Sequence, residues 1–182
     1  GVGGSVTSIS RRGHATFPGS GPDGFERSVE LMGVVPVVSA VMGTAAGGPS
    51  GRAILAHWSV MVKDTSQIFA AGPPVVERAW GTKVTKEELG GHKMAVDAAG
   101  TIDNAADSEA DCLAQIRRFL SYLPSNVWEL PPRGACADPV DRCEDALASI
   151  VPRSKRQPYD MRKLVAMIVD RDSTFEIQDR KS

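Results

Sequence analysis

The sequence predicts an α/β fold, and three observations lead to that prediction. Short apolar or β-branched runs alternate along the chain with stretches of helical character. The strongest run, VVPVVSAVM at residues 34–42, is almost continuously apolar, as is typical of a strand covered on both faces in a parallel sheet. Two later stretches carry apolar residues at helical spacing. Strands that alternate with helices are the pattern of α/β domains.

Composition and charge narrow the class of protein. The chain has 182 residues, enough for one domain with a sizeable core, and 42% of them are hydrophobic and 24% charged. Lys and Arg total 21 against 22 Asp and Glu, so no net field attracts nucleic acid or an anionic membrane. No apolar stretch approaches the roughly 20 residues of a membrane span. We therefore expect neither nucleic acid nor a membrane as a partner.

The cysteines indicate a reducing compartment. Cys112, Cys136 and Cys143 are odd in number and form no Cys-x-x-Cys pair, which argues against a disulfide framework and against a zinc site. Residues 1–20 are rich in Gly and Ser and lack the apolar run of a signal peptide. We expect free thiols in a cytosol-like environment.

The first elements are expected to be short. Residues 1–24 are Gly-rich and predict the start of a helix followed by a long loop. FERSVELMG at 25–33 predicts a short helix that ends at its glycine. The buried strand follows over 34–42, where Pro36 lies near the start and is tolerated.

A loop of small residues then leads to further short elements. The segment 50–58 predicts a helix with Ser50 as its N-cap. Residues 59–72 predict two short strands split by KDTS. Residues 73–80 predict a helix that opens on proline, and 85–91 predicts a helical turn closed by glycines.

Two longer helices are expected in the second half. One covers 107–123 and the other 159–171, with Tyr159-Asp160 at its cap, and both are expected to face a core. A Pro-rich connector at 124–139 separates them, and STFEIQ at 173–178 predicts a last strand. The apolar positions with helical spacing are Cys112, Leu113, Ile116, Phe119, Leu120 and Leu123, then Met161, Leu164, Val165, Ile168 and Val169.

The loop after the first strand, MGTAAGGPSG at 42–51, has no acid, base or thiol. A buried strand that runs through glycines into a helix N-terminus exposes backbone N–H groups above the sheet. These donors suit a phosphate, or the oxyanion of a thioester that becomes an enolate. No lysine follows the glycines, and G-x-G-x-x-G is absent. A tight turn that needs small residues only for packing is the third interpretation.

Five segments, in order, resemble one family. They are LMGVVPVVSAVMGTAAGGPSGRA, MVKDTSQIFAAGPPVV, VTKEELGG, RRFLSYLP and IVPRSKRQPYDMRKLVAMIVDRDSTFEI. Together they resemble the β subunit of biotin-dependent acyl-CoA carboxylases, the carboxyltransferase component of propionyl-CoA and related carboxylases. The resemblance covers roughly residues 29–178, and it is less clear in the first 28.

The resemblance implies a crotonase-like fold, a ββα spiral, of which this chain is a partial domain. Subunits of the family contain two such domains. Residues 1–182 then form the C-terminal part of the N-terminal, acyl-CoA-side domain, and the biotin-side second domain is absent. In the family, the backbone N–H groups of a glycine pair hold the thioester carbonyl, and these positions are Gly47 and Gly48 here. The substrate-binding positions that the resemblance implies are Gly43, Thr44, Ala45 and Ala46 under the acyl chain, and the turn at Gly72-Pro73.

The implied reaction moves a carboxyl group from carboxybiotin to the α-carbon of an acyl-CoA of the propionyl-CoA or acetyl-CoA type. Biotin, carried by a partner subunit or domain, supplies the base, which explains a loop without titratable side chains. The implied partners are acyl-CoA, a biotin carboxylase or biotin carrier subunit, and other β subunits or the missing second domain. The implied location is the cytoplasm, or the mitochondrial matrix in a eukaryote. We expect the isolated chain to be inactive.

The sequence departs from the family at one position near the LGG motif. Many relatives have a histidine four residues after it, where this chain has Ala95, and the nearest histidine is His92. Two other functions remain open. One is another CoA-thioester enzyme of the same fold, a decarboxylase or a hydratase, and the hydratase would use Glu77, Glu87 or Glu88. The other is a non-catalytic acyl-CoA-binding or assembly subunit.

The remaining polar residues give weaker indications of a functional site. His14, His57 and His92 have no carboxylate or cysteine at ligand spacing, so we predict no metal site and no catalytic triad. Ser50 lacks the Gly-x-Ser-x-Gly context of a nucleophile, which favours an N-cap. RSKR at 153–156 is interpreted as a solvated loop, with contact to CoA phosphates or a biotin carboxylase subunit as the alternative.

Overall fold

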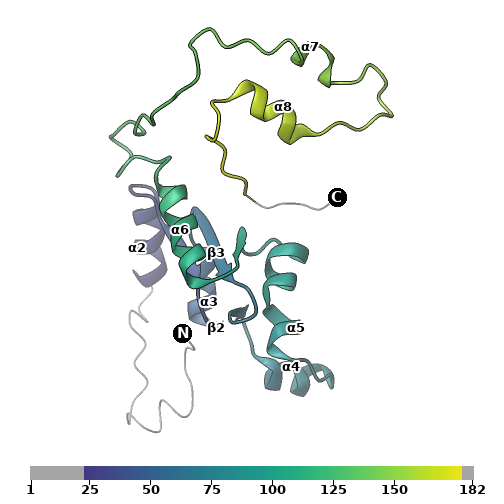
Figure 1. Ribbon diagram of the computed structural model, residues 1–182. Helices are drawn as coiled ribbons and strands as arrows, with labels where there is room; N and C mark the ends of the chain where they lie inside the picture. The colour runs from purple at the N-terminus through teal and green to yellow at the C-terminus, as the bar shows by residue number, and fades with distance from the viewer. Residues whose placement is uncertain (1–22, 178–182) are drawn as a thin grey trace. The chain divides into compact units, whose positions relative to one another are not determined.

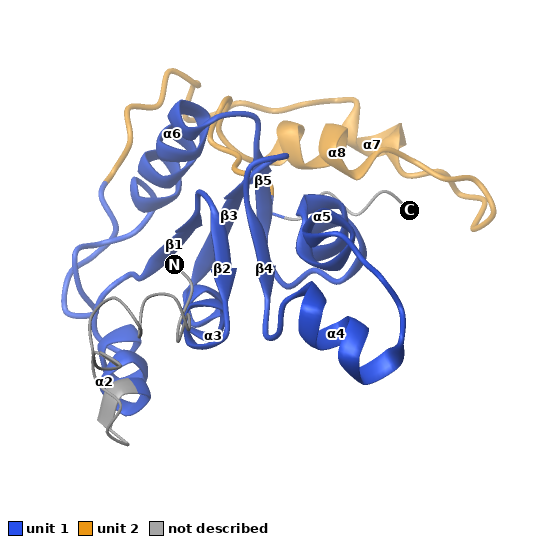
Figure 2. Cartoon of the chain, turned by 90° about the horizontal axis from the view of Figure 1, so that it is seen from below, with its two compact units in different colours: residues 1–132, 177–182 blue, residues 133–176 orange. Residues whose placement is uncertain are grey.

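The computed structural model describes residues 23–177, which form two compact units (Figure 2). Among the described residues, the first unit holds 23–132 and Ile177, and the second holds 133–176. The boundary falls inside the predicted Pro-rich connector, where residues 127–137 are all exposed. Figure 1 labels helices α2 to α8 and strands β2 and β3, and Figure 2 also labels β1, β4 and β5. None of the helices in the described part is long and apolar enough to cross a membrane.

The first unit contains two small parallel sheets. One has the strand order β1-β3-β5, in which β1 is Val38–Val41, β3 is Trp58–Val62 and β5 is Asn104–Ala106. In the other, β2 (Thr44–Ala46) pairs with β4 (Gln67–Phe69). The central strand β3 is buried along its full length, as expected for a parallel strand covered on both faces. The α/β prediction with a parallel sheet is therefore confirmed.

Short helices connect these strands, and local side-chain caps begin two of them. Gly33 directly follows helix α2 (Asp23–Met32), as predicted. Thr85 forms a capping box with Glu88 at the start of helix α5 (Lys86–Gly90). Ser108 caps the last helix of the unit by accepting from the Asp111 N–H. The other helices are α3 (Gly48–Ile54), α4 (Pro73–Trp80), the π-helix η1 (Lys93–Ala98) and α6 (Glu109–Leu120).

The core lies around strand β3. Met61 is fully buried in a cluster with residues of β1, β2, β4 and η1. Trp58 is also fully buried, and its ring stacks on Phe119 of α6 with 5.0 Å between the ring centroids. Cys112 of α6 is fully buried as well, so α6 is a core-facing helix, as its spacing predicts.

Several element predictions need correction. The strand predicted over 34–42 covers only Val38–Val41, and the small-residue loop contains a strand of its own, β2. The helix predicted over 50–58 begins at Gly48 and ends at Ile54, because Trp58 belongs to β3. Gly47, and not Ser50, is its N-cap.

Other differences lie toward the C-terminus. Residues 173–177 form no strand, and no local pattern predicted β5 or the π-helix. The predictions for residues 1–22 and 178, including His14, lie outside the described residues.

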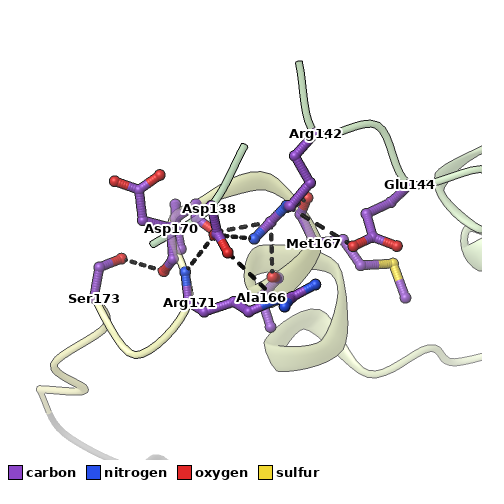
Figure 3. Close-up of polar contacts among 9 residues, drawn as sticks. Asp138, Arg142, Glu144, Ala166, Met167, Asp170, Arg171 and Ser173 are labelled. Atoms are coloured by element: carbon purple, nitrogen blue, oxygen red, sulfur yellow. Dashed lines mark hydrogen bonds and ion pairs between the residues drawn. The ribbon is translucent and has the colours of Figure 1, made fainter. Parts of the chain in front are cut away.

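The second unit contains α7 (Leu147–Ile150) and α8 (Met161–Ile168), which contact each other. Asp160 caps α8, as predicted, by accepting from the Arg162 N–H at 2.9 Å. Arg142 caps the C-terminal end of α8. Its Nη2 donates to the carbonyls of Met167 and Val169, each at 2.9 Å (Figure 3). The Asp138 carboxylate lies against the same guanidinium, and it also accepts from the Arg171 N–H at 2.9 Å.

Candidate functional site

The glycine pair of the small-residue loop lies at the junction of strand β2 and helix α3. Gly47 has φ 68° and ψ −130°, a backbone conformation that is strained for any residue with a Cβ. This conformation turns the chain from β2 directly into α3, which begins at Gly48. The sequence uses glycine at 47 because the turn requires it.

The two amides of the pair have different surroundings. The Gly47 N–H donates to the Phe69 carbonyl of β4 at 3.2 Å. The Gly48 N–H is at the first position of α3, where no earlier helical carbonyl can accept it, and it has no backbone acceptor among the described residues. Of the two amides that the resemblance assigns to the substrate, the structure therefore leaves Gly48 available.

Ser50 is bound to the same turn. Its hydroxyl donates to the Gly47 carbonyl at 2.5 Å, and its own N–H donates to that carbonyl at 3.0 Å. The residue is buried inside α3, which corrects its predicted role as an N-cap. Its proton is held by a backbone carbonyl, and no histidine takes part.

An apolar cavity of about 380 Å³ lies beside the turn. Its walls come from Gly47 and α3, from β4, and from the α5–η1 segment. This volume is within the range of small-molecule sites, which runs from roughly 300 to 1,000 Å³. The residues that line it are Gly47, Ser50, Gly51, Ile54, Ile68, Phe69, Ala70, Leu89, Gly90, Met94, Ala95 and Thr101. No described residue in this lining carries an acid, an amine or an imidazole.

The other predicted substrate-binding residues do not line this cavity. Thr44 instead donates from Oγ1 to Gln67 Oε1 at 2.7 Å, and Ala45 is buried in the core cluster. A Cβ added to Gly43 would meet nothing within 4 Å, so that position is open. Gly72 caps α4 and Pro73 occupies its first turn, with Phe69 packed against Gly72. Ala46, the last residue of β2, directly precedes the turn.

The wall formed by α5 and η1 is a part of the site that sequence reasoning missed. Gly90 lies so close to β4 that an added Cβ would be 2.0 Å from the Ile68 carbonyl oxygen. Ala95, four residues after the LGG motif, is buried and lines the cavity. The LGG motif was a signal for this wall, since a glycine in a helix often marks a close approach of backbones.

None of the three candidate glutamates lines the cavity. Glu88 caps its own helix, and the Thr85 backbone N–H and hydroxyl that bind its carboxylate hold its pKa below the usual value. Glu77 lies 3.8 Å from Lys83. Glu87 accepts from Gln67 Nε2 at 3.1 Å and has its other oxygen 3.6 Å from His92 Nδ1.

The remaining predicted polar groups have structural surroundings. His57 Nδ1 accepts from the Val37 N–H at 3.0 Å. All three cysteines are free, as predicted, and burial raises the pKa of the Cys112 thiol, so it is a poor nucleophile. The cluster at 153–156 is fully exposed, which agrees with a solvated loop.

Comparison with known proteins places the chain in a family. The carboxyl transferase domain matches residues 3–181. The carboxyltransferase subunit of propionyl-CoA carboxylase from Haloferax mediterranei is 41% identical over 155 residues, which is 85% of this chain and 30% of that protein. The methylmalonyl-CoA decarboxylase subunit alpha of Veillonella parvula is 38% identical over 154 residues, with the same coverage. The mitochondrial propionyl-CoA carboxylase beta chain of Sus scrofa is 39% identical over 155 residues, 85% of this chain and 29% of that one.

Solved structures give the same result. A transcarboxylase 12S structure with methylmalonyl-CoA and methylmalonic acid bound has a TM-score of 0.79 and 31% identity, over 85% of this chain and 30% of that one. The geranyl-CoA carboxylase beta subunit of P. aeruginosa has a TM-score of 0.51 and 30% identity, over 84% of this chain and 28% of that one. These similarities confirm the crotonase-type α/β fold that the sequence resemblance implies.

The chain spans about 30% of the length of the curated relatives it matches. The match to the family nevertheless extends over nearly all of the chain itself. The strand, the glycine turn and the LGG wall that surround the cavity all lie inside the matched residues. The chain therefore belongs to the carboxyl transferase domain family.

Proposed function

We propose that this chain is part of the carboxyltransferase component of a biotin-dependent acyl-CoA carboxylase. The reaction transfers a carboxyl group from carboxybiotin to the α-carbon of an acyl-CoA of the propionyl-CoA or acetyl-CoA type. The observation that carries this proposal is the Gly48 N–H, which has no backbone acceptor among the described residues and directly follows Gly47, a residue of the cavity lining, in a chain that belongs to the carboxyl transferase family.

The chemistry of the cavity fits a reaction whose base comes with a cofactor. The lining offers hydroxyls, a thioether and apolar groups, but no described residue there can take a proton from carbon at neutral pH. Biotin, when it is bound by a partner, supplies the carboxyl group and the base. The chain itself binds the acyl group in the apolar cavity and keeps water away from the α-carbon.

Gly48 has the role of stabilising charge. As the α-proton leaves, negative charge grows on the thioester oxygen, and the Gly48 N–H donates a hydrogen bond to that oxygen. One such donor is worth roughly 2.7–4 kcal/mol of barrier in known oxyanion holes. Gly47 acts differently: its bond to Phe69 and its backbone conformation fix the direction in which α3 begins. We assign Gly48 as the donor and Gly47 as the residue that positions it.

The family resemblance also assigns six further residues to the substrate. We place Gly43, Thr44, Ala45 and Ala46, which lead into the glycine turn but do not line the cavity, under the acyl chain, and Gly72-Pro73 near the mouth of the substrate cleft. We propose that residues 1–182 correspond to the C-terminal part of the acyl-CoA-side domain, and that a biotin-side domain or another β subunit completes the site. The match to transcarboxylase 12S, which assembles as a hexamer, supports an oligomer.

We further propose that the partners are a biotin carboxylase or biotin carrier subunit, and that the isolated chain has no turnover. The similarity to the carboxyltransferase subunit of a propionyl-CoA carboxylase supports such partners. The free thiols and the match to a mitochondrial relative support the cytoplasm, or the mitochondrial matrix in a eukaryote.

A second candidate function is decarboxylation of a malonyl-type CoA thioester. The 38% identity to methylmalonyl-CoA decarboxylase subunit alpha from Veillonella parvula favours it. The same enolate forms in both directions, so Gly48 would serve either reaction. A hydratase is less well supported, because Glu77, Glu87 and Glu88 all lie outside the cavity lining.

The experiment that separates these functions uses the complete carboxyltransferase that carries this segment, with its biotin-bearing partner. Propionyl-CoA is offered with a carboxybiotin donor, and methylmalonyl-CoA is offered alone. Carboxylation that depends on the donor supports the first function, and loss of CO₂ from methylmalonyl-CoA without net carboxylation supports the second. Tight binding of CoA thioesters with neither reaction, and with no exchange of the α-proton, would contradict both and favour a non-catalytic subunit.

A further inference from the structure

Three polar side chains that are distant in the sequence meet at the end of the first unit's β3–β4 turn. Asp64 lies in that turn, Glu87 lies on α5, and His92 immediately precedes the π-helix. One ligand atom from each of the three lies within 4.8 Å of the other two. Asp64 is far from Glu87 and His92 in the sequence, so the three do not form a recognisable ligand motif. For this reason the sequence predicts no metal site.

Two atoms of this group are buried without a hydrogen-bond partner. Glu87 Oε1 and His92 Nδ1 are both inaccessible to solvent, and neither makes a hydrogen bond. The two atoms lie 3.6 Å apart, too far for a hydrogen bond between them. Polar atoms buried in this way are costly, so a pair of them that face each other indicates a missing ligand.

The distances match those between ligands that share one metal ion. Ligand atoms around a tetrahedral Zn²⁺ at 2.0–2.2 Å are about 3.3 Å from one another. His92 Nδ1 is 3.6 Å from Glu87 Oε1 and 3.8 Å from Asp64 Oδ1. A small closure of the three side chains would therefore bring all three atoms into bonding range of a central ion.

The surroundings hold the Glu87 carboxylate in place. Its second oxygen accepts from Gln67 Nε2 at 3.1 Å, and Gln67 in turn accepts from Thr44 Oγ1 at 2.7 Å. Hydrogen bonds of this kind orient the carboxylate ligands of metal sites. Gly91 leaves space for the Glu87 carboxylate, because a Cβ at position 91 would lie only 2.0 Å from Glu87 Oε1.

We propose that Asp64, Glu87 and His92 bind a divalent transition-metal ion of the zinc class. One imidazole and two carboxylates are borderline-to-hard ligands that suit such an ion, and neither sulfur nor a further imidazole is needed. The Asp64 side chain is 84% exposed, so the fourth position faces solvent and is filled by water. The ion would connect the β3–β4 turn to the LGG wall of the cavity.

The test is a calorimetric titration of the metal-free full chain with Zn²⁺, with Mg²⁺ as the comparison ion. We expect saturable Zn²⁺ binding at one site, a rise in the thermal midpoint with Zn²⁺, and no comparable effect of Mg²⁺, which prefers oxygen ligands and water. Glu87→Gln and His92→Ala should each weaken Zn²⁺ binding by at least about 10-fold. Asp97→Asn, an exposed carboxylate of the π-helix outside the group, is the matched control and should bind as the wild type does.

Cys136→Ser removes a competing possibility, since Cys136, Asp138 and Asp170 also place ligand atoms within 4.8 Å of one another. A measurement on the unmutated chain does not depend on whether the variants fold. In it, Zn²⁺ should shift the NMR signals of the His92 ring and leave those of the His57 ring unchanged. The proposal is overturned if the chain shows no saturable Zn²⁺ binding, if binding survives both Glu87→Gln and His92→Ala, or if the His92 ring signals do not respond. Because these readouts do not involve turnover, they are independent of the proposed carboxyl transfer.

Discussion

Gly47 connects the local backbone to the proposed chemistry. Its φ of 68° with ψ of −130° is open to glycine but strained for other residues, and it sets where α3 begins. The next amide, that of Gly48, is the donor we assign to the substrate oxygen. The identity of one residue therefore determines both the turn and the availability of its neighbour.

We predict that Gly47→Ala lowers the free energy of unfolding by about 1–3 kcal/mol, because alanine must adopt the strained conformation. The added methyl itself has room, since its nearest neighbour is the Ala70 carbonyl oxygen at 3.9 Å. Gly43→Ala is the matched control, because that glycine has no positive φ and open space around it. It should change stability by less than about 0.5 kcal/mol. Urea unfolding of the two variants measures the difference, and equal stability of both would contradict the account.

The sequence indicates the small-residue loop as a candidate site but could not distinguish its two amides. The distinction depends on Phe69, which lies on β4 and whose carbonyl accepts from Gly47. Such a pairing depends on which strands lie side by side, and local composition does not encode it. The meeting of Glu87 and His92 with Asp64 was hidden for the same reason.

At the scale of elements, the start of α5 is fixed by a reciprocal pair of bonds. The Glu88 N–H donates to Thr85 Oγ1 at 3.1 Å, and the Glu88 carboxylate accepts from the Thr85 N–H at 2.8 Å. The Thr85 hydroxyl also donates to that carboxylate at 2.8 Å. This box anchors the helix that ends in the LGG wall of the cavity.

We predict that Thr85→Ala lowers the free energy of unfolding by about 0.5–2 kcal/mol at neutral pH. Thr82→Ala, an exposed threonine outside the box, is the control and should have little effect. The pKa of Glu88 is lowered in the folded chain, so its contribution is present above the usual glutamate pKa of about 4.3 and is lost as the pH falls through the lowered value. The gap between wild type and Thr85→Ala should therefore narrow in acid, although the bond from the Glu88 N–H remains. Unfolding curves at neutral and acidic pH measure the gap, and a gap that widens in acid would contradict this assignment.

The end of α8 depends on a buried ion pair. Only 13% of the Arg142 side chain and 7% of the Asp138 side chain are exposed, and Arg142 also donates to carbonyls at the C-terminus of α8 (Figure 3). On the same unit, Arg162 pairs with Glu176 at 2.7 Å, but both side chains are more than half exposed. The two arginines therefore make a matched comparison of a buried and an exposed pair.

We predict that Arg142→Ala destabilises α8 by about 1–3 kcal/mol, because the buried Asp138 carboxylate loses its guanidinium partner and keeps only Arg171, and the last carbonyls of α8 lose their donor. Arg162→Ala should cost only about 0.2–1 kcal/mol, since an exposed pair is screened by water. Hydrogen exchange of the α8 amides measures both, because it reports the opening of this helix separately from the first unit. Equal protection factors in the two variants would contradict the role given to Arg142.

Elements with strong periodicity were predictable, and weakly marked ones were not. The apolar spacing of α6 and the Asp160 cap of α8 are strong local signals, and both elements form close to the expected places. Strand β5 is only the three residues Asn104–Ala106, with no β-branched side chain, and it exists because it pairs with β3. The π-helix has no local signal either, which explains why both were missed.

For the whole molecule, the chain is a carboxyl transferase segment that spans about 30% of its relatives' length and divides into two compact units. The Pro-rich composition of residues 124–139 predicted a connector where the units divide. The family, too, could be recognised from the sequence, because its motifs recur in order over most of the chain. The complete active site could not be read from this segment, since we propose that a second domain or subunit completes it.

The most direct test of the account is turnover of the complete carboxyltransferase with Gly48→Pro, compared with Gly48→Ala. Proline is well tolerated at the first position of a helix and replaces the N–H with a ring carbon, whereas alanine keeps the N–H. We predict that Gly48→Pro lowers kcat by roughly 10²–10³, the loss typical of one oxyanion donor, and that Gly48→Ala retains much more activity. A folded Gly48→Pro enzyme that carboxylates acyl-CoA at the wild-type rate would contradict the account.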